Sequence, residues 1–154
     1  MAISYRHNEA VVAHTALFNR SNYRCPLKLH LDNPHGEFRI SSYAEDAIVV
    51  NDERYTGSVI VTPTNPPESW DLNEITRLDI QAMEPLLAGK PEVVLIGTGP
   101  RQIFPDVAVL AYLSKREIGI EIMDSRAACR TFNIVAGEGR RVVAGLLPLA
   151  AVSG

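Results

Sequence analysis

The sequence predicts an α/β domain, and three observations support this class. The apolar run at residues 93–96 is typical of a strand covered on both faces. Two similar runs follow at 119–123 and 141–148, and helical patterns separate all three. The first half of the chain instead contains short alternating segments and turn residues, which favours a β-meander. The strand–helix–strand alternation predicts right-handed parallel crossovers.

The first half is expected to form short strands. Residues 28–32 alternate in polarity, and residues 38–42 and 47–50 are further strand candidates. A tight turn at Asn51-Asp52 leads into residues 54–62, which are expected to form one strand with a buried end. Three prolines follow, and because proline has no N–H to donate, the sheet is expected to pause there.

A first helix is expected to begin at the capping-box-like residues 76–79 and to bury Ile80, Met83 and Leu87 on one face. Trp70, which precedes it, is interpreted as a packing anchor because large aromatic side chains mostly serve packing.

Two more helices are expected after the strand at 93–96. One opens at residues 105–107, with Val107, Leu110 and Ala111 facing inward and Leu113 as a further candidate for that face. The other covers residues 126–136, is capped by Asp124 or Ser125, and ends at two glycines.

Length and composition limit the organisation and the partners. A chain of 154 residues with 46% hydrophobic residues predicts one domain, placed at residues 27–150, after an N-terminal extension at residues 1–26. The formal net charge of −3 disfavours nucleic acid and anionic membranes as partners. No window resembles a membrane span. The sequence leaves the oligomeric state open.

The two cysteines, Cys25 and Cys129, have no metal-ligand spacing, so a reducing compartment is expected. We predict a cytoplasmic protein of bacterial type. The mitochondrial matrix is the alternative, because the N-terminal extension carries three arginines against one acidic residue.

The turn after residues 93–96 is the first candidate site. Gly97 and Gly99 begin a dinucleotide-binding pattern, but Gln102 stands where the third glycine is required, and the lysine of a phosphate-binding P-loop is absent. Its backbone N–H groups, with Thr98, Arg101 and Gln102, are candidates for holding a carboxylate or phosphate. The alternative is that the glycines only let the strand turn into the next helix.

The second candidate segment begins at Asp124, again where a strand ends. Carboxyl ends of parallel strands meet at one edge of a sheet, so the two segments are expected to be neighbours. Arg130 is a candidate anion ligand, or a structural tie to Asp124 or Glu138. Together the two segments give these candidate ligand-binding residues: Thr98, Gly99, Arg101, Gln102, Asp124, Ser125, Arg130, Thr131 and Asn133.

No catalytic constellation is evident. The four histidines lie in the N-terminal quarter without metal-ligand spacing, and no paired carboxylates stand out. Cys129 is interpreted as a buried packing thiol. Catalytic residues therefore remain unknown, no metal or cofactor is predicted, and an enzymatic role is disfavoured.

The segments PEVVLIGTGPRQIFP and GIEIMDSRAACRTFNIVAGEGRRVVAGLLP closely resemble the family called domain of unknown function 498, which includes a mitochondrial complex I assembly factor. Ser125 stands where many relatives have threonine. The resemblance implies a three-layer α/β domain with a central mixed β-sheet, one antiparallel strand, helices on one side and an additional β layer. It implies no common reaction.

Three hypotheses about function follow. The leading one is a non-enzymatic binding or assembly-type domain with a protein partner. The second is a domain, or an enzyme, that binds a small anionic metabolite through the N–H groups of residues 98–101 together with Arg130 and Asn133. The third is that these loops serve only the fold.

Overall fold

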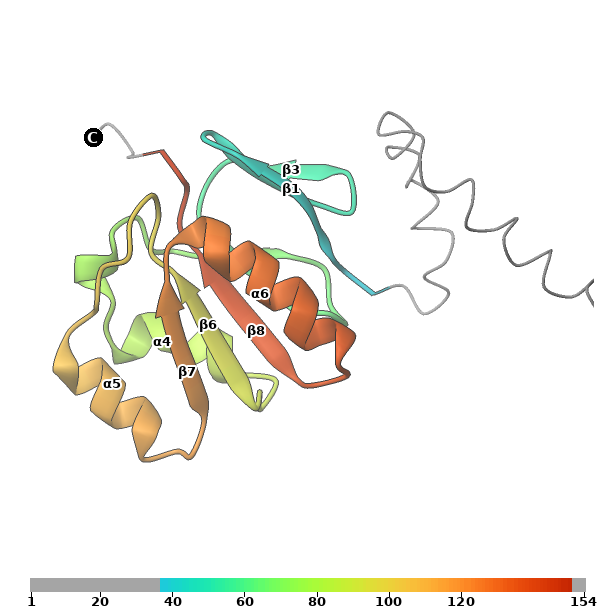
Figure 1. The fold of residues 1–154 in the computed structure, drawn as a ribbon. Coiled ribbons are helices and arrows are strands. Elements are labelled where there is room, and N and C mark those ends of the chain that lie inside the picture. The colour runs from blue at the N-terminus through green and yellow to red at the C-terminus, as the bar shows by residue number, and fades with distance from the viewer. Residues whose placement is uncertain (1–36, 151–154) are drawn as a thin grey trace, which may run out of the picture. The chain divides into compact units, whose positions relative to one another are not determined.

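The computed structural model describes residues 37–150 (Figure 1). The expected extension at residues 1–26, the strand at 28–32 and Cys25 lie outside the described residues. The strands are β1 (Ile40–Ala44), β2 (Ala47–Val50), β3 (Glu53–Tyr55), β4 (Val59–Val61), β5 (Glu68–Ser69), β6 (Val93–Gly97), β7 (Gly119–Met123) and β8 (Val142–Leu146). The helices are the short 3₁₀ turn η1 (Ile75–Arg77) and the α-helices α4 (Ile80–Leu87), α5 (Val107–Ser114) and α6 (Ser125–Gly137).

The expected meander is a separate three-stranded sheet in the order β1-β2-β3, antiparallel throughout. Asn51 and Asp52 form the turn between β2 and β3 in the left-handed conformation, with φ of 47° and 78°. The expected single strand at 54–62 is wrong, because it breaks before Val59 and its halves enter different sheets. The residues of β3 are exposed or half-buried, whereas all three residues of β4 are buried.

The larger sheet has five strands in the order β5-β4-β8-β6-β7. Strands β8, β6 and β7 run parallel, and β4 is antiparallel to β8, so the prediction of a mixed sheet is confirmed. Their carboxyl ends lie together at the top of the sheet in Figure 1. The predicted strand at 93–96 lies inside the sheet, and every residue of β6 is buried.

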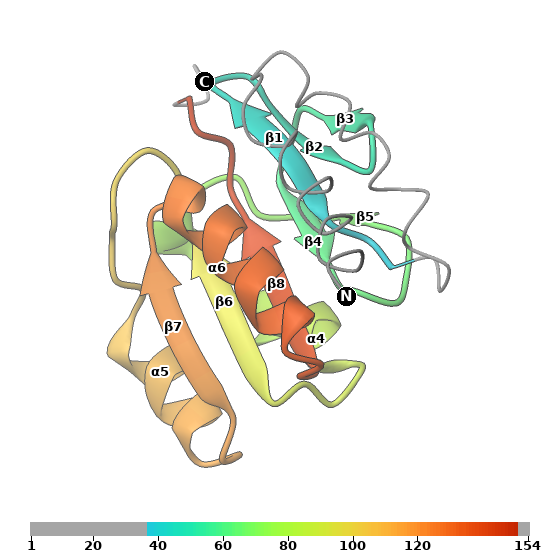
Figure 2. The same cartoon turned by 45° about the vertical axis from the view of Figure 1, so that its right-hand side comes forward.

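Helices cover both faces of this sheet, so the expectation of helices on one side is wrong (Figure 2). Helix α6 and the β1-β2-β3 meander share one hydrophobic cluster on one face. Helices α4 and α5 share another cluster on the opposite face. Right-handed crossovers explain the arrangement: the chain moves outward from β6 to β7 and then back to β8, and opposite directions place α5 and α6 on opposite faces.

The helix starts differ in detail from the predictions. Asp79 is the N-cap of α4 and accepts a hydrogen bond from the Ala82 N–H at 2.8 Å, so the α-helix begins after the expected capping box. Helix α5 begins at Val107, whose side chain is exposed, contrary to the prediction; the helix buries Leu113, one of the predicted inward-facing residues, together with Val109. These two residues are four positions apart and therefore lie on one face.

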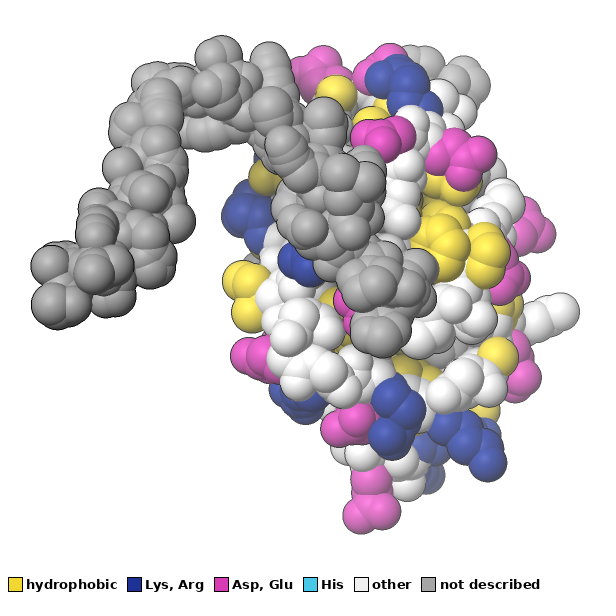
Figure 3. All heavy atoms as spheres, turned by 90° about the vertical axis from the view of Figure 1, so that its right-hand side faces the viewer, with side chains coloured by type: hydrophobic (Ala, Val, Ile, Leu, Met, Phe, Trp, Pro, Cys, Tyr) yellow, Lys and Arg dark blue, Asp and Glu magenta, His cyan; other side chains and the backbone are white. Residues whose placement is uncertain are grey.

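Acidic and basic side chains alternate over the visible part of the face drawn in Figure 3, without a continuous basic patch among the described residues there. In residues 37–150, none of the helices has the length and apolar character needed to cross a bilayer.

Candidate functional site

The two candidate segments meet, as their position at the carboxyl ends of β6 and β7 predicts. The Ser125 N–H donates to the Gly99 carbonyl at 2.8 Å, and the Gly99 N–H donates to the Ser125 hydroxyl at 2.8 Å. The same hydroxyl donates to the Leu147 carbonyl at 2.7 Å, just after β8. Because Ser125 is fully buried, this hydroxyl joins three segments from inside the protein.

The two glycines of the turn are required by packing and by backbone conformation. A Cβ on Gly97 would lie 2.9 Å from both the Ser125 hydroxyl and a Leu146 methyl group. Gly99 has φ of +98°, a conformation that glycine adopts without steric cost. The glycines thus allow the close approach of β6, α6 and β8.

The polar groups of Thr98 are used within the turn. The Thr98 N–H donates to the Met123 carbonyl at 2.9 Å, and its hydroxyl accepts from the Ile103 N–H at 3.1 Å and contacts the Arg101 carbonyl. Pro100 has no N–H, and that of Gly99 is already bonded. Of the amides at 98–101, this leaves the one of Arg101 to meet a ligand. The anion-binding hypothesis stays a prediction, but the turn would offer an anion one backbone N–H group and not the several that the sequence suggested.

The polar side chains at the start of α6 and along it have different partners, and two of them, Arg130 and Asn133, bond to β1 of the meander. Asp124 is the N-cap and accepts from the Ala127 N–H at 2.9 Å. Thr131 directs its hydroxyl toward the Met123 sulfur, 3.5 Å away. Arg130 donates to the Tyr43 hydroxyl at 2.9 Å on an exposed surface, so the tie it forms is with β1.

Asn133 binds β1 through both atoms of its side-chain amide. Its oxygen accepts from the Ile40 N–H at 3.0 Å, and its nitrogen donates to the Ile40 carbonyl at 2.8 Å. An asparagine amide presents one acceptor and one donor side by side, so it completes the hydrogen bonding of one strand residue. Asn133 therefore fastens the meander to α6.

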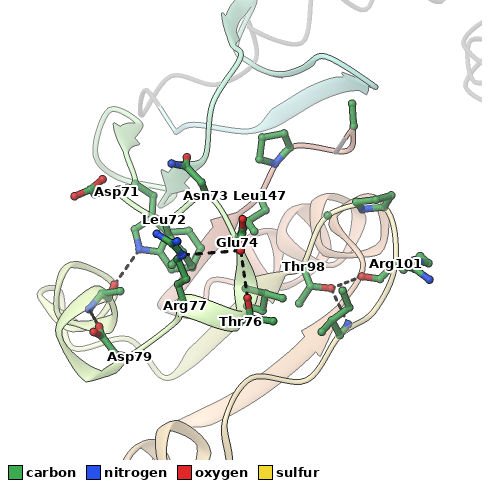
Figure 4. Close-up of a pocket in the computed structure, with 18 of the residues that line it drawn as sticks. Asp71, Leu72, Asn73, Glu74, Thr76, Arg77, Asp79, Thr98, Arg101 and Leu147 are labelled. Atoms are coloured by element: carbon green, nitrogen blue, oxygen red, sulfur yellow. Dashed lines mark hydrogen bonds and ion pairs between the residues drawn. The ribbon is translucent and has the colours of Figure 1, made fainter. Parts of the chain in front are cut away.

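A cleft of about 1000 Å³ opens beside the glycine turn (Figure 4). One wall is the turn itself, the other is the segment from Trp70 through η1 to the start of α4, and Leu147, Pro148 and Ala150 complete it. Of the candidate residues, the cleft is lined by Thr98, Gly99 and Arg101. It is not lined by Gln102, Asp124, Ser125, Arg130, Thr131 or Asn133.

The second wall of the cleft was not predicted from the sequence. It carries Asp71, Glu74 and Asp79, and also Arg77, which lies 3.9 Å from Glu74. Trp70 is the one residue in this segment that stands out in the sequence, but an isolated tryptophan indicates packing and does not predict a cleft wall. Its ring is 3% exposed, and the indole N–H donates to the Ala82 carbonyl at 2.9 Å, so the packing interpretation is confirmed. In the part of the chain that the structure describes, no three His, Cys, Asp or Glu residues gather as a metal site would require.

Comparison with known proteins decides the family. The model of the family described as "Protein of unknown function (DUF498/DUF598)" matches residues 40–147, which include both candidate segments and the meander. The chain belongs to this family. The match begins at the first residue of β1 and ends just after β8, so it covers both sheets and the three α-helices.

Curated relatives of this DUF498/DUF598 chain carry two kinds of name. The human protein "NADH dehydrogenase [ubiquinone] 1 alpha subcomplex assembly factor 3" is 32% identical over 112 residues, which are 71% of this chain and 60% of that protein. The "13 kDa major membrane protein" of Francisella tularensis is 29% identical over 101 residues, 65% of this chain and 82% of that protein. The chain thus spans about three-fifths of the human assembly factor.

A crystal structure from Bordetella parapertussis has the same fold as this DUF498/DUF598 protein. The two are 35% identical, the TM-score is 0.68, and the match covers 73% of this chain and 96% of that one. This chain and the Bordetella parapertussis protein are therefore similar both in sequence and in their mixed α/β architecture.

The buried thiol of Cys129 is expected to make the stability of this DUF498/DUF598 protein depend on pH. Burial raises the pKa of its thiol to about 12, whereas the ordinary value is 9.0. Between these values the unfolded chain loses the proton and the folded chain keeps it. The stabilisation is thus present below pH 9 and is lost as pH rises toward 12. Urea unfolding from pH 8 to 11 should show stability falling more steeply in the wild type than in Cys129→Ala. Parallel curves for the two proteins would contradict the prediction.

Proposed function

We propose that this chain is a non-enzymatic protein-binding domain of the assembly-factor type. The observation that carries the proposal is a group of three exposed apolar side chains between the glycine turn and the first residue of α5, interrupted by the buried Pro105 and the exposed Asp106. Ile103, Phe104 and Val107 are 37%, 65% and 76% exposed, respectively. We call residues 103–107 the apolar loop. Exposed apolar groups gathered in one place are typical of surfaces that bind other proteins.

The polar residues beside the apolar loop support binding rather than catalysis. Ser125 is fully buried and bonded to Gly99 and Leu147, and the Thr98 hydroxyl is bonded within its own turn. A catalytic group has to reach the substrate, and these groups already serve the fold. Burial also keeps the Cys129 thiol protonated at neutral pH, so it is a poor nucleophile.

The relatives support the same proposal. Among them are animal proteins named as assembly factors of NADH dehydrogenase. An assembly factor acts through protein contacts, and the apolar loop provides a surface of the right chemistry. We place this activity in the cytoplasm, with the mitochondrial matrix as the alternative. Relatives from both bacteria and animals are compatible with either.

The first test replaces Phe104 with aspartate. Because its side chain is 65% exposed, the substitution should leave the fold intact while placing a charge at the centre of the apolar loop. The tagged chain is expressed in cells of the organism that it comes from and purified, and the proteins that co-purify with it are quantified by mass spectrometry. We expect Phe104→Asp to lose proteins that the wild type retains, including subunits of a larger complex.

The matched control is Ile134→Asp. Ile134 is 63% exposed but lies on α6, away from the apolar loop. It should retain the proteins recovered with the wild type. If Phe104→Asp and Ile134→Asp both recover the same proteins as the wild type, the apolar loop is not the binding surface and the proposal fails.

A further inference from the structure

The outer edge of β7 is an unpaired strand edge. β7 is the last strand of the five-stranded sheet and pairs only with β6. The Gly119 N–H donates to the Glu92 backbone carbonyl at 3.0 Å, and the Met123 carbonyl accepts from the Thr98 N–H at 2.9 Å. The backbone groups of Gly119 and Met123 therefore face β6. Backbone direction alternates along a strand, and the N–H and C=O groups of Ile120 and Ile122 therefore point away from the sheet.

One side chain occupies part of this edge. The Gln102 amide donates to the Ile122 carbonyl at 2.8 Å. Among the described residues, no hydrogen bond is made by the Ile122 N–H or by either backbone group of Ile120. Gln102 thus satisfies one of four outward backbone groups, and it does so with a side chain that can rotate away.

The side chains of β7 define what an added strand would meet. Ile120 and Ile122 pack with α5 on one face. Glu121 pairs in register with Leu95, whose side chain belongs to the cluster on the α6 face, and it is exposed. In residues 37–150, Glu121 makes no ion pair. An added strand would therefore place apolar side chains toward α5 and one side chain beside a free carboxylate.

The apolar loop lies next to this edge. Gln102, which reaches Ile122, immediately precedes Ile103 and Phe104 in the chain. Figure 1 shows the segment between β6 and α5 descending along the outer side of β7. The segment that carries the exposed apolar residues therefore passes beside the unpaired edge of β7.

We propose that an extended segment of a partner protein adds to β7 as an antiparallel strand, displacing the Gln102 amide and contacting the apolar loop. The inference rests on the proposed function and specifies how the partner is held. The segment alternates in polarity, with apolar residues facing α5 and a lysine or arginine opposite Glu121. Unpaired backbone groups select an extended chain over a helix, and opposite charges across a strand pair stabilise it.

The antiparallel direction follows from hydrogen-bond geometry. Antiparallel bonds are perpendicular to the strands, and this pairing is slightly more stable per residue than the parallel one. In this arrangement the residues opposite Ile120 and Ile122 bond to β7. The residue of the added strand that lies opposite Glu121 directs its own N–H and C=O groups away from β7.

The test uses a fluorescently labelled peptide, Thr-Val-Thr-Val-Lys-Val-Thr-Val-Thr, and anisotropy titrations with the full-length chain. In the first arm, N-methylation of the two valines flanking lysine should abolish binding, because their amides face β7. N-methylation of the lysine amide is the matched control and should leave binding intact. The opposite pattern, or equal binding of all three peptides, overturns the proposal.

The second arm reverses the charge. Glu121→Lys should weaken binding of the lysine peptide by about threefold to tenfold. A peptide with glutamate in place of lysine should recover that loss with Glu121→Lys and bind the wild type poorly. Equal binding of both peptides to both proteins excludes a position opposite Glu121 and overturns the proposal.

The third arm removes the competing side chain. Gln102→Ala should bind the lysine peptide about threefold to tenfold more tightly, since one hydrogen bond no longer has to be displaced. Weaker or unchanged binding contradicts the displacement of Gln102. If Gln102→Ala instead becomes dimeric in sedimentation and excludes the peptide, a second copy of this chain is the occupant and the proposal is overturned.

The outcomes separate this inference from the proposed function. If the lysine peptide does not bind while Phe104→Asp still loses co-purifying proteins, the proposal of strand addition is wrong and protein binding by the apolar loop stands. If the peptide binds as expected while Phe104→Asp loses nothing, the edge accepts a strand but the proposed function fails.

Discussion

Replacing Trp70 with alanine is expected to lower the free energy of unfolding by about 3–5 kcal/mol, the usual range for removing a buried aromatic side chain. The ring belongs to the cluster that joins α4 and α5 to the sheet. It also covers Gly145 of β8, where an added Cβ would lie 2.7 Å from the ring. Alanine leaves this space empty and leaves the Ala82 carbonyl without its indole donor. Urea unfolding followed by circular dichroism measures the loss.

Two variants control for the cause. Trp70→Phe keeps most of the apolar contact and loses the N–H, so it should be less destabilising than Trp70→Ala. Gly145→Ala should destabilise the wild type by about 1–3 kcal/mol through overpacking, and less in the Trp70→Ala background. A Trp70→Ala protein as stable as the wild type would mean that the ring does not support the cleft wall.

Replacing Asn133 with alanine is expected to cost about 2–3 kcal/mol, because one substitution removes two hydrogen bonds and leaves both backbone groups of Ile40 unpaired in a half-buried place. Asn133→Asp tests the geometry. Its carboxylate still accepts from the Ile40 N–H but repels the Ile40 carbonyl, so a loss is expected here too. Thermal and urea unfolding of both variants check this result.

Arg130→Ala is the matched control for Asn133. It removes an exposed hydrogen bond to Tyr43 from the same helix, so the change should stay within about 0.5 kcal/mol. A neutral Asn133→Ala would contradict the structural role, and the residue would then be better interpreted as a ligand-binding group.

The sequence predicted the strands of the larger sheet well, because continuous apolar runs have few other interpretations. The run at 93–96 is β6, and the strand predicted at 119–123 matches β7 residue for residue. The meeting of the glycine turn with Ser125 was also predictable, since parallel strands bring their carboxyl ends to one edge.

The direction of the side chains on α6 was not predictable from the helix alone. The spacing of Arg130 and Asn133 shows that they lie near one another on its surface, but their partners are on β1, about 90 residues earlier in the chain. Contacts of this kind depend on where the meander packs. The prediction of a single strand at 54–62 failed for the same reason, because the sheet that a strand joins depends on partners elsewhere in the chain.

The buried Ser125 hydroxyl has a consequence for recognition. It holds the glycine turn, the first turn of α6 and the segment after β8 as one preorganised body at the base of the apolar loop. Part of the conformational entropy of this region is therefore lost when the protein folds rather than when a partner arrives. Binding to a support that is already ordered loses less free energy to ordering. The buried Ser125 hydroxyl is therefore expected to strengthen the proposed association without touching the partner.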